Sequence, residues 1–210
     1  MHTGRAYHEF MLASARDRKV RRRFQRQALG LVPPQASILD FGGGTGIDAK
    51  VYAAQGHRVF VHEPAESMRN YLVCHCREEM AQGRVILGDL AAAAPIHLIT
   101  ANFAVLNLIA DQATLFAQFG RRLLPGGFVL ASLLNPFFLG DAKYSWWRAN
   151  LGALVKRGTY FVPGKSGNVH RFAPKIVARA AQPNFRVARV IPRGAGLAIG
   201  RYMFMLFQKA

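Results

Sequence analysis

An apolar run, an acid and a set of closely spaced glycines follow one another in Ile38-Leu39-Asp40-Phe41-Gly42-Gly43-Gly44-Thr45-Gly46. The residues behind the glycines, 47–54, are typical of a helix, so the segment predicts a strand, a glycine turn and a helix. Glycine is required where a side chain would keep the backbone away from a ligand. The turn also presents backbone N–H groups and the positive end of a helix dipole to that ligand.

Two classes of nucleotide-like ligand use a turn of this kind. The spacing Gly44-x-Gly46-x-x-Ala49 fits a relaxed dinucleotide fingerprint. The wider spelling Asp40-x-Gly42-x-Gly44-x-Gly46 resembles motif I of the class I S-adenosylmethionine-dependent methyltransferases. The later strand ends distinguish the two classes, because the methyltransferase family has an acid after each of its first three strands.

The second and third predicted strands both end at an acid. Residues 58–63 form the second strand, and Glu63-Pro64 lies about twenty residues past the glycines, where an acid binds ribose hydroxyls in either fold. Residues 84–87 form the third strand and are followed by Gly88-Asp89-Leu90. In the methyltransferases an acid at this place meets the adenine amino group, whereas a dinucleotide enzyme has no standing need for Asp89.

The rest of the pattern agrees with the same family. Strands are predicted over 96–103 and 128–134, and Leu123-Leu124-Pro125-Gly126-Gly127 before the latter is similar to the family's usual entry into its fifth strand. Alternation with predicted helices indicates a parallel sheet covered on both faces. The resemblance spans about residues 36–135 and implies a doubly wound, mostly parallel α/β sheet of seven strands, in the order 3-2-1-4-5-7-6. The helices are predicted over 46–55, 66–82, 111–123 and 174–181, and the last two strands, of which the seventh is antiparallel, over 185–191 and 202–207.

The length of 210 residues suits one domain. One or two amphipathic helices are expected in the N-terminal segment 1–34, and 136–172 is expected to be an insertion after the fifth strand that covers the active site, since it is too long and too aromatic for a plain connection. No apolar run reaches the ~18 residues of a membrane helix, and the N-terminus lacks the apolar core of a signal peptide. A cytoplasmic location is expected, and peripheral attachment to the inner face of the membrane stays open.

The charge of the chain is high and uneven. The net charge is +17, and residues 142–210 contain Lys and Arg but no Asp or Glu. Such an excess indicates nucleic acid, an anionic membrane surface, an acidic partner, or only a solvated arginine-rich surface. Nucleic acid is the less favoured partner, because no nucleic-acid-binding module is recognisable. Cys74 and Cys76 point apart on a helix, so neither a disulfide nor a metal site is expected there.

The resemblance implies that the strand ends hold S-adenosylmethionine, with S-adenosylhomocysteine as product and no metal. The acid and glycines of motif I surround the methionine part, Glu63 falls on the ribose and Met68 lies near the adenine edge. Ordinary turn or strand-end acids and core packing are the alternatives for these residues. The expected cofactor residues are Asp40, Gly42, Gly43, Gly44, Gly46, Glu63, Pro64, Met68, Asp89, Leu90, Asn102 and Phe103, the last two at the carboxyl edge where open α/β sheets bind ligands.

The acceptor end of the site is less clearly marked. His170, at the end of the insertion, is the candidate general base because a histidine pKa lies near neutrality. The aromatic residues Tyr144, Trp146 and Trp147 are candidates for the wall of an apolar pocket. Arg148 is the candidate for holding a carboxylate or phosphate of the acceptor. A structural histidine and self-packing of the insertion are the alternatives.

The sequence therefore predicts a methyltransferase of the EC 2.1.1 type that acts on a small, apolar or aromatic, or lipid-like acceptor. A nucleic-acid or ribosomal-protein methyltransferase and a non-catalytic cofactor-binding module of the same fold stay open, and a nicotinamide oxidoreductase is least favoured. Asn102-Phe103-Ala104-Val105 lacks the Asn-Pro-Pro-aromatic signature of amino-group methylation of nucleic acid or protein, which counts against the first alternative. The sequence assigns no oligomeric state.

Overall fold

The computed structural model describes residues 3–88, 95–164 and 167–210. Two compact units make up the chain. The first comprises Met1–Asn102 with Arg122–Phe128, and the second comprises Phe103–Arg121 with Val129–Ala210. The prediction of one domain over 1–210 stays a prediction.

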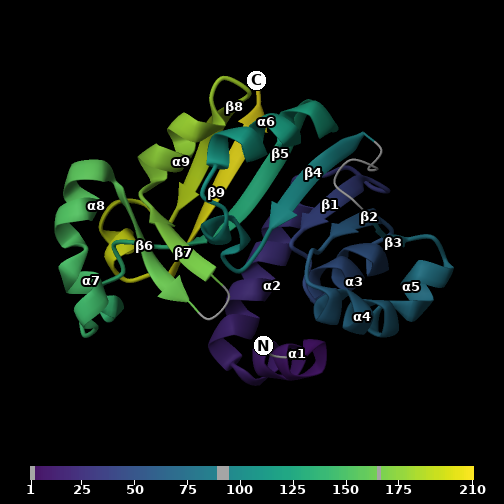
Figure 1. Ribbon diagram of the computed structural model, residues 1–210. Coiled ribbons are helices and arrows are strands. Elements are labelled where there is room, and N and C mark those ends of the chain that lie inside the picture. Colours follow the sequence, from purple (N-terminus) through teal and green to yellow (C-terminus); the bar gives the residue numbers. More distant parts are fainter. Residues whose placement is uncertain (1–2, 89–94, 165–166) are drawn as a thin grey trace. The chain divides into compact units, whose positions relative to one another are not determined.

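The seven-stranded sheet has the order β3-β2-β1-β4-β5-β9-β8 (Figure 1). In the first unit β1 pairs in parallel with β2 and β4, and β2 pairs in parallel with β3. In the second unit β8 and β9 are antiparallel. The predicted order is thereby confirmed, since β8 and β9 are the sixth and seventh strands of the prediction. The strands are β1 (Ser37–Phe41), β2 (Arg58–His62), β3 (Val85–Leu87), β4 (Ile96–Ala101), β5 (Leu123–Leu134), β8 (Phe185–Ile191) and β9 (Tyr202–Lys209).

The N-terminal segment forms two helices, α1 (Gly4–Ala13) and α2 (Ala15–Leu29). Ser14 separates them because its extended backbone ends α1, while its side chain accepts a hydrogen bond from the N–H of Asp17 and caps α2. Gly4 lets α1 approach the first turns of α4 (Glu66–His75), since a Cβ at Gly4 would collide with the carbonyl oxygen of Ser67. The start of the chain is therefore packed on the helix that follows β2.

The helix predicted over 66–82 is interrupted. α4 ends at His75, and α5 (Arg77–Ala81) follows after Cys76, whose φ of −104° and ψ of 23° leave the helical region. The Cys76 thiol is buried and lies 3.6 Å from the carbonyl oxygen of Gly46, at the start of α3 (Ile47–Ala54). The break accompanies this contact with the glycine turn, which a local helical pattern does not reveal.

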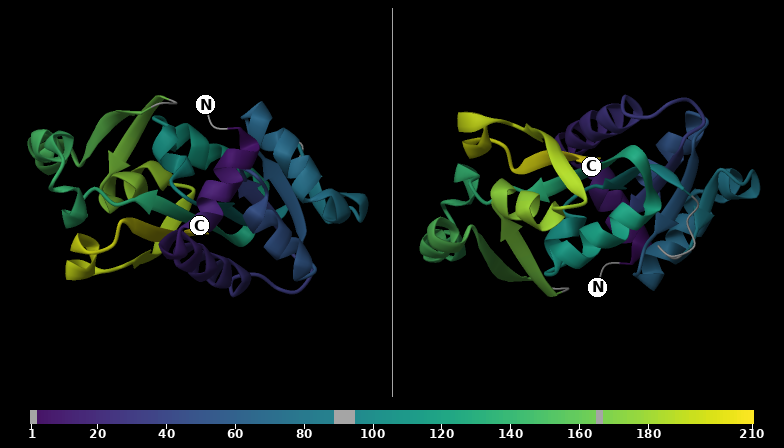
Figure 2. Two further views of the ribbon diagram at one scale, coloured as in Figure 1. Left: turned by 90° about the horizontal axis from the view of Figure 1, so that it is seen from below. Right: turned by 90° about the horizontal axis from the view of Figure 1, so that it is seen from above.

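In the second unit the predicted insertion, 136–172, has regular structure of its own. Figure 2 shows the hairpin of β6 and β7, which forms a separate two-stranded sheet, beside the two short helices that precede it. β5 begins earlier than predicted, at Leu123, and passes through Gly126 in the left-handed region. No helix in the described ranges is long and apolar enough to cross a membrane. The other elements are η2 (Val105–Leu108), α6 (Gln112–Arg122), η3 (Leu139–Asp141), α7 (Ser145–Ala149), α8 (Leu151–Arg157), β6 (Thr159–Gly164), β7 (Gly167–Phe172), α9 (Pro174–Ala181) and η4 (Gly194–Ala198).

Candidate functional site

The glycine turn lies at the carboxyl end of β1, and each of its glycines has a structural reason. Gly42, Gly44 and Gly46 have φ values of 72°, 57° and 79°, a region that strains residues with a side chain. Gly43 lacks a positive φ but is tightly packed. A Cβ at Gly43 would lie 2.5 Å from Cγ1 of Val61 and 3.0 Å from Oδ2 of Asp40. The glycines therefore permit the tight turn, in which the N–H groups of Gly42 and Gly43 donate to the carbonyl oxygen of His62 at 2.7 and 3.3 Å.

Glu63, directly after β2, holds the glycine turn by hydrogen bonds. Its Oε2 accepts from the N–H of Gly44 at 2.8 Å, and its Oε1 accepts from the N–H of Ala65 at 2.9 Å. A carboxylate oxygen has two lone pairs. The same carboxylate can therefore order the turn and accept further hydrogen bonds from a ligand's hydroxyl groups.

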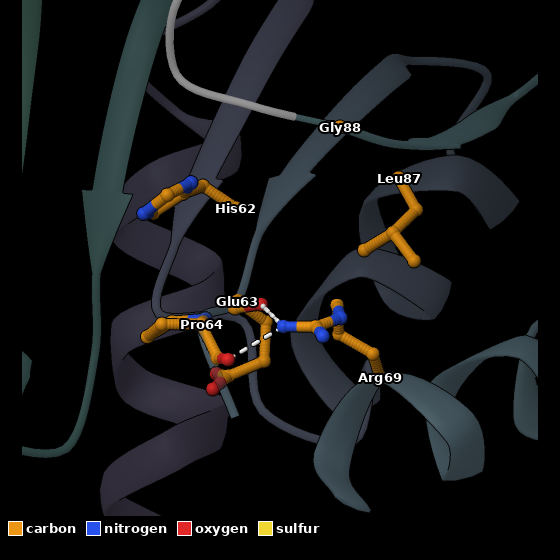
Figure 3. Close-up of a pocket in the computed structure, with 6 residues that line it drawn as sticks. All are labelled: His62, Glu63, Pro64, Arg69, Leu87 and Gly88. Carbon is orange, nitrogen blue, oxygen red and sulfur yellow. Dashed lines mark hydrogen bonds between the residues drawn. The ribbon is translucent and has the colours of Figure 1, made fainter. Parts of the chain in front are cut away.

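A pocket of about 430 Å³ opens beside Glu63 at the ends of β2 and β3 (Figure 3). The guanidinium of Arg69 points toward the backbone of Glu63 and Pro64, and its Nη1 donates to their carbonyl oxygens at 3.0 and 2.5 Å. These bonds fix one wall of the pocket. Its size lies within the range of small-molecule sites, and it is lined by His62, Glu63, Pro64, Arg69, Leu87 and Gly88.

Asp40 is buried behind the glycine turn with one oxygen unpaired. Its Oδ1 accepts from the hydroxyl of Thr100 at 3.0 Å, whereas its Oδ2 is buried without a hydrogen-bond partner among the described residues. Burial raises the pKa of Asp40 to about 8; Asp48 adds to the rise and the hydrogen bond from Thr100 opposes it. Buried polar atoms are nearly always hydrogen-bonded. The unpaired oxygen fits a ligand that brings a donor or a positive charge to the turn.

The carboxylate of Asp48 accepts hydrogen bonds from three side chains in separate parts of the chain. Its carboxylate accepts from Nη1 of Arg21 at 2.6 Å, from Nε2 of Gln25 at 2.7 Å and from Nδ2 of Asn102 at 2.9 Å. Asn102, expected at the cofactor, is thus bonded to the first turn of α3. Sequence reasoning missed Arg21, Gln25 and Asp48. The available signal was an acid two residues after the last glycine.

The first helix also reaches the glycine turn. A Cβ at Gly44 would lie 3.7 Å from Cε1 of Tyr7, and Nδ1 of His8 lies 3.0 Å from the hydroxyl of Thr45. Burial raises the pKa of Tyr7, while Arg21 opposes the rise. Met68 is half-buried in the first turn of α4. Asp89 and Leu90 lie outside the described residues.

In the second unit, Phe103 follows β4 with an unusual backbone. Phe103 and Ala104 both have positive φ, 53° and 67°, which strains residues with a side chain. The N–H of Ala104 donates to the carbonyl of Ser132 at 2.8 Å, and the Phe103 ring meets Tyr202 edge-on at 5.3 Å. The strained residue is held by β5 and β9.

His170, the expected general base, lies on β7 among aromatic rings. Its ring stacks on Phe172 at 5.6 Å and lies 6.1 Å from the ring of Phe161. Its backbone carbonyl accepts from Nδ2 of Asn107 at 2.6 Å. The structure thus fixes the position of His170 within the hairpin.

The four acceptor candidates are only partly brought together. Tyr144 and Trp146 stack at 5.6 Å, whereas Nε1 of Trp147 donates to the backbone of Pro136 at 3.0 Å. Arg148 is exposed and donates to the carbonyl oxygen of Ala142 at 2.7 Å. The guanidinium that covers the ring of Trp146, at 5.4 Å, is that of Arg171, which sequence reasoning did not select.

The comparisons with known proteins agree with this geometry. A family model described as a methyltransferase domain matches residues 12–165. No curated protein matches the chain. Many solved structures share the fold, at identities low enough that the likeness shows the fold alone.

Three of these solved structures illustrate the likeness. An S-adenosylmethionine-dependent methyltransferase from Clostridium acetobutylicum is 12% identical with a TM-score of 0.66, over 97% of this chain and 96% of that one. The glycopeptide N-methyltransferase MtfA, complexed with S-adenosylhomocysteine, is 18% identical with a TM-score of 0.62, over 90% and 89%. The N-methyltransferase NodS from Bradyrhizobium japonicum, in complex with the same product, is 14% identical with a TM-score of 0.63, over 95% and 90%.

Proposed function

This chain belongs to the class I S-adenosylmethionine-dependent methyltransferases, and on that footing we propose that it binds S-adenosylmethionine at the glycine turn and methylates a small acceptor. The observation that carries the proposal is the pairing of Gly44 with Glu63 beside a pocket of about 430 Å³. The two structural neighbours MtfA and NodS hold S-adenosylhomocysteine and support the same ligand here.

The residues around the turn fit the chemical groups of this cofactor. Glu63 accepts from the ribose hydroxyls, and the pocket at the ends of β2 and β3, which Pro64 helps to line, takes the adenosine part. The unpaired Oδ2 of Asp40 accepts a hydrogen bond from a donor on the methionine part. A positive charge beside Asp40 favours its ionised form, which opposes the effect of burial.

The work of the protein in methyl transfer is placement. S-adenosylmethionine, when bound, supplies a methyl group that positive charge on sulfur has already activated. The chain holds the reacting groups in line and keeps water away. Glu63 and the glycine turn are ordered by each other before the ligand arrives, so little conformational freedom is lost on binding.

The acceptor is proposed to be small and aromatic or lipid-like, and to bind through the segment 136–172. The stacked Tyr144 and Trp146 support an apolar surface for it. His170 is the proposed general base for an acceptor that must lose a proton. His170 is half-buried, and its ring lies beside those of Phe161 and Phe172.

Calorimetry with S-adenosylhomocysteine, S-adenosylmethionine and NAD tests the proposal. We expect both sulfur compounds to bind and NAD to bind far more weakly. Glu63→Ala should weaken binding by about tenfold to a hundredfold, the loss of hydrogen bonds to a charged group. Glu66→Ala, an exposed acid three residues further along, is the matched control and should leave binding unchanged. Unchanged binding in Glu63→Ala would remove Glu63 from the site, and equal binding of NAD would overturn the cofactor assignment.

A further inference from the structure

Tyr160 and Arg171 are directly opposite each other in the β6–β7 ladder. Side chains of opposed residues project from the same face of a hairpin and lie next to each other. Both are buried, with exposed fractions of 6% and 9%. A phenol and a guanidinium are thus enclosed together in the segment expected to receive the acceptor.

Several donors of this pair have no acceptor. Nε and Nη1 of Arg171 and the hydroxyl of Tyr160 are buried without a hydrogen-bond partner in the part of the chain that the structure describes. Nη2 of Arg171 lies 3.6 Å from Oδ2 of Asp141, which is longer than a hydrogen bond. Leaving buried polar groups unpaired costs free energy. These donors are therefore candidates for hydrogen bonds to a bound molecule.

The chemistry of the missing partner follows from these donors. A carboxylate has two oxygens with about four lone-pair positions, and it matches a guanidinium together with a hydroxyl. The charge around the pair favours one further anion, because Asp111 and Asp141 are the only acids in the second unit. A dianionic phosphate is less suitable, since it would repel the nearby Asp141 more strongly.

Aromatic side chains lie beside the guanidinium of Arg171. The guanidinium of Arg171 lies over the ring of Trp146 at 5.4 Å, and Tyr144 stacks on the same tryptophan. Tyr160 further belongs to a small apolar core with Leu154 and Ala173. The donors thus sit in apolar surroundings, where hydrogen bonds to an anion are strong.

We propose that Tyr160 and Arg171 form a carboxylate-binding site, and that the methyl acceptor of this enzyme is a small aromatic carboxylic acid bound there by its carboxylate. The assignment of the bound acid as acceptor rests on the proposed methyltransferase function. Binding of a carboxylate to the pair can be measured independently of methyl transfer. Arg171 replaces Arg148 as the arginine that recognises the acceptor.

Benzoate, with the neutral benzamide as its isostere, is a suitable probe. Benzoate added to the full chain should shift the Arg171 Nε–H signal in a ¹H–¹⁵N spectrum and raise the melting temperature, and benzamide should do neither. The signal is assigned by its disappearance in Arg171→Lys. Absence of a benzoate response, or an equal response to benzamide, would overturn the proposal.

Two variants separate recognition from a structural role. Tyr160→Phe removes an unpaired hydroxyl, so the unliganded protein should keep its melting temperature while benzoate affinity falls about tenfold. Arg171→Lys keeps the charge beside Asp141 but loses the planar donor set, and should lose the benzoate response. Arg179→Met, an exposed arginine on α9, is the control and should bind benzoate as the unchanged chain does. A loss of folded stability in Tyr160→Phe with unchanged benzoate affinity would assign the pair to the fold instead.

Calorimetry with S-adenosylhomocysteine on the same proteins keeps this inference distinct from the proposed function. Both Tyr160→Phe and Arg171→Lys should bind the product as the unchanged chain does. If benzoate binds through Arg171 but S-adenosylhomocysteine does not bind at all, the carboxylate site stands and the methyltransferase proposal fails. If the reverse holds, the carboxylate site fails alone.

Discussion

The Nδ1 atom of His8 lies 3.0 Å from the hydroxyl oxygen of Thr45, so the first helix is joined to the glycine turn 37 residues further along the chain. Both side chains are buried. The ring of His8 also contacts the rings of Tyr71 and His75, at 4.8 and 4.5 Å, on α4. The N-terminal helix is thereby part of the structure that orders the turn.

Thr45→Val should destabilise the chain by about 1–3 kcal/mol, because it leaves a buried ring nitrogen of His8 without its partner. Urea denaturation measures the loss. A double-mutant cycle with His8→Phe is the control, since the cost of Thr45→Val should shrink when the imidazole is absent. An equal cost in both backgrounds would mean that the contact contributes nothing to stability.

Asp40 predicts a pH dependence of stability. Its folded pKa of about 8 exceeds the unfolded value of about 3.9. Between these values the folded chain keeps a proton that the unfolded chain releases, so stability falls as pH rises. Asparagine at position 40 cannot ionise. The melting temperature of Asp40→Asn should therefore rise relative to that of the unchanged chain as the pH increases between these two pKa values. Glu66→Gln, at an exposed acid in the first turn of α4, should run parallel to the unchanged chain, and a parallel curve for Asp40→Asn would contradict the burial argument.

Gly44→Ala and Gly56→Ala form a matched pair. Both glycines have positive φ, 57° and 84°, so each substitution should cost about 1–2 kcal/mol of stability. A Cβ at Gly56 has no atom within 4 Å, whereas one at Gly44 projects from the turn toward Tyr7. Only Gly44→Ala should therefore lose S-adenosylhomocysteine affinity in calorimetry. A similar loss in Gly56→Ala would show that strain, not access to the turn, is responsible.

Breaking the buried ion pair of Arg21 and Asp48 should lower the stability of the fold more than breaking an exposed ion pair. Its side chains are 11% and 5% exposed, and Asp48→Asn would remove the carboxylate charge that lies 2.6 Å from the Arg21 guanidinium. We expect a loss of about 3–5 kcal/mol in denaturant unfolding. The exposed pair of Arg5 and Glu9, broken by Glu9→Gln, should cost less than about 1 kcal/mol. Equal costs for the two pairs would refute the importance of burial here.

The basic second unit is expected to attach to an anionic membrane surface. On α8, Val155 is 78% exposed and Leu151 lies one turn earlier, with Lys156 and Arg157 in the last turn. Pelleting with anionic vesicles should exceed pelleting with neutral ones and weaken steeply with salt. Val155→Ser should reduce it, and Val73→Ser, an exposed valine on α4, should not. If the chain does not bind vesicles at low salt, its excess positive charge is only a solvated surface. Salt-resistant RNA binding would favour a nucleic-acid acceptor.

Much of the fold was predictable because its signals are local. The glycines of the turn, the acid at the end of β1 and Glu63 after β2 follow from residues close together in the chain, whereas the order of the seven strands was implied by the resemblance to the family. Conformational freedom and hydrophobic periodicity act over a few residues, so they can be read without knowing what lies across the fold. The break at Cys76 escaped prediction because the contact that accompanies it, with Gly46, lies 30 residues away in the chain.

The hydrogen-bond and ion-pair partners of the polar side chains could not be predicted from the sequence. That Asp48 would gather Arg21 and Asn102, from positions 27 and 54 residues away, depends on how α2, α3 and β4 pack. The pairing of Tyr160 with Arg171, and the burial that leaves their donors unpaired, depends on the register of a hairpin and on what covers it. The chain's own residues specify its strands, its turn and its family, since these rest on local geometry. Which charges meet, and which are left for a ligand, is settled by packing between distant segments, because burial and hydrogen bonding exist only once the chain has folded.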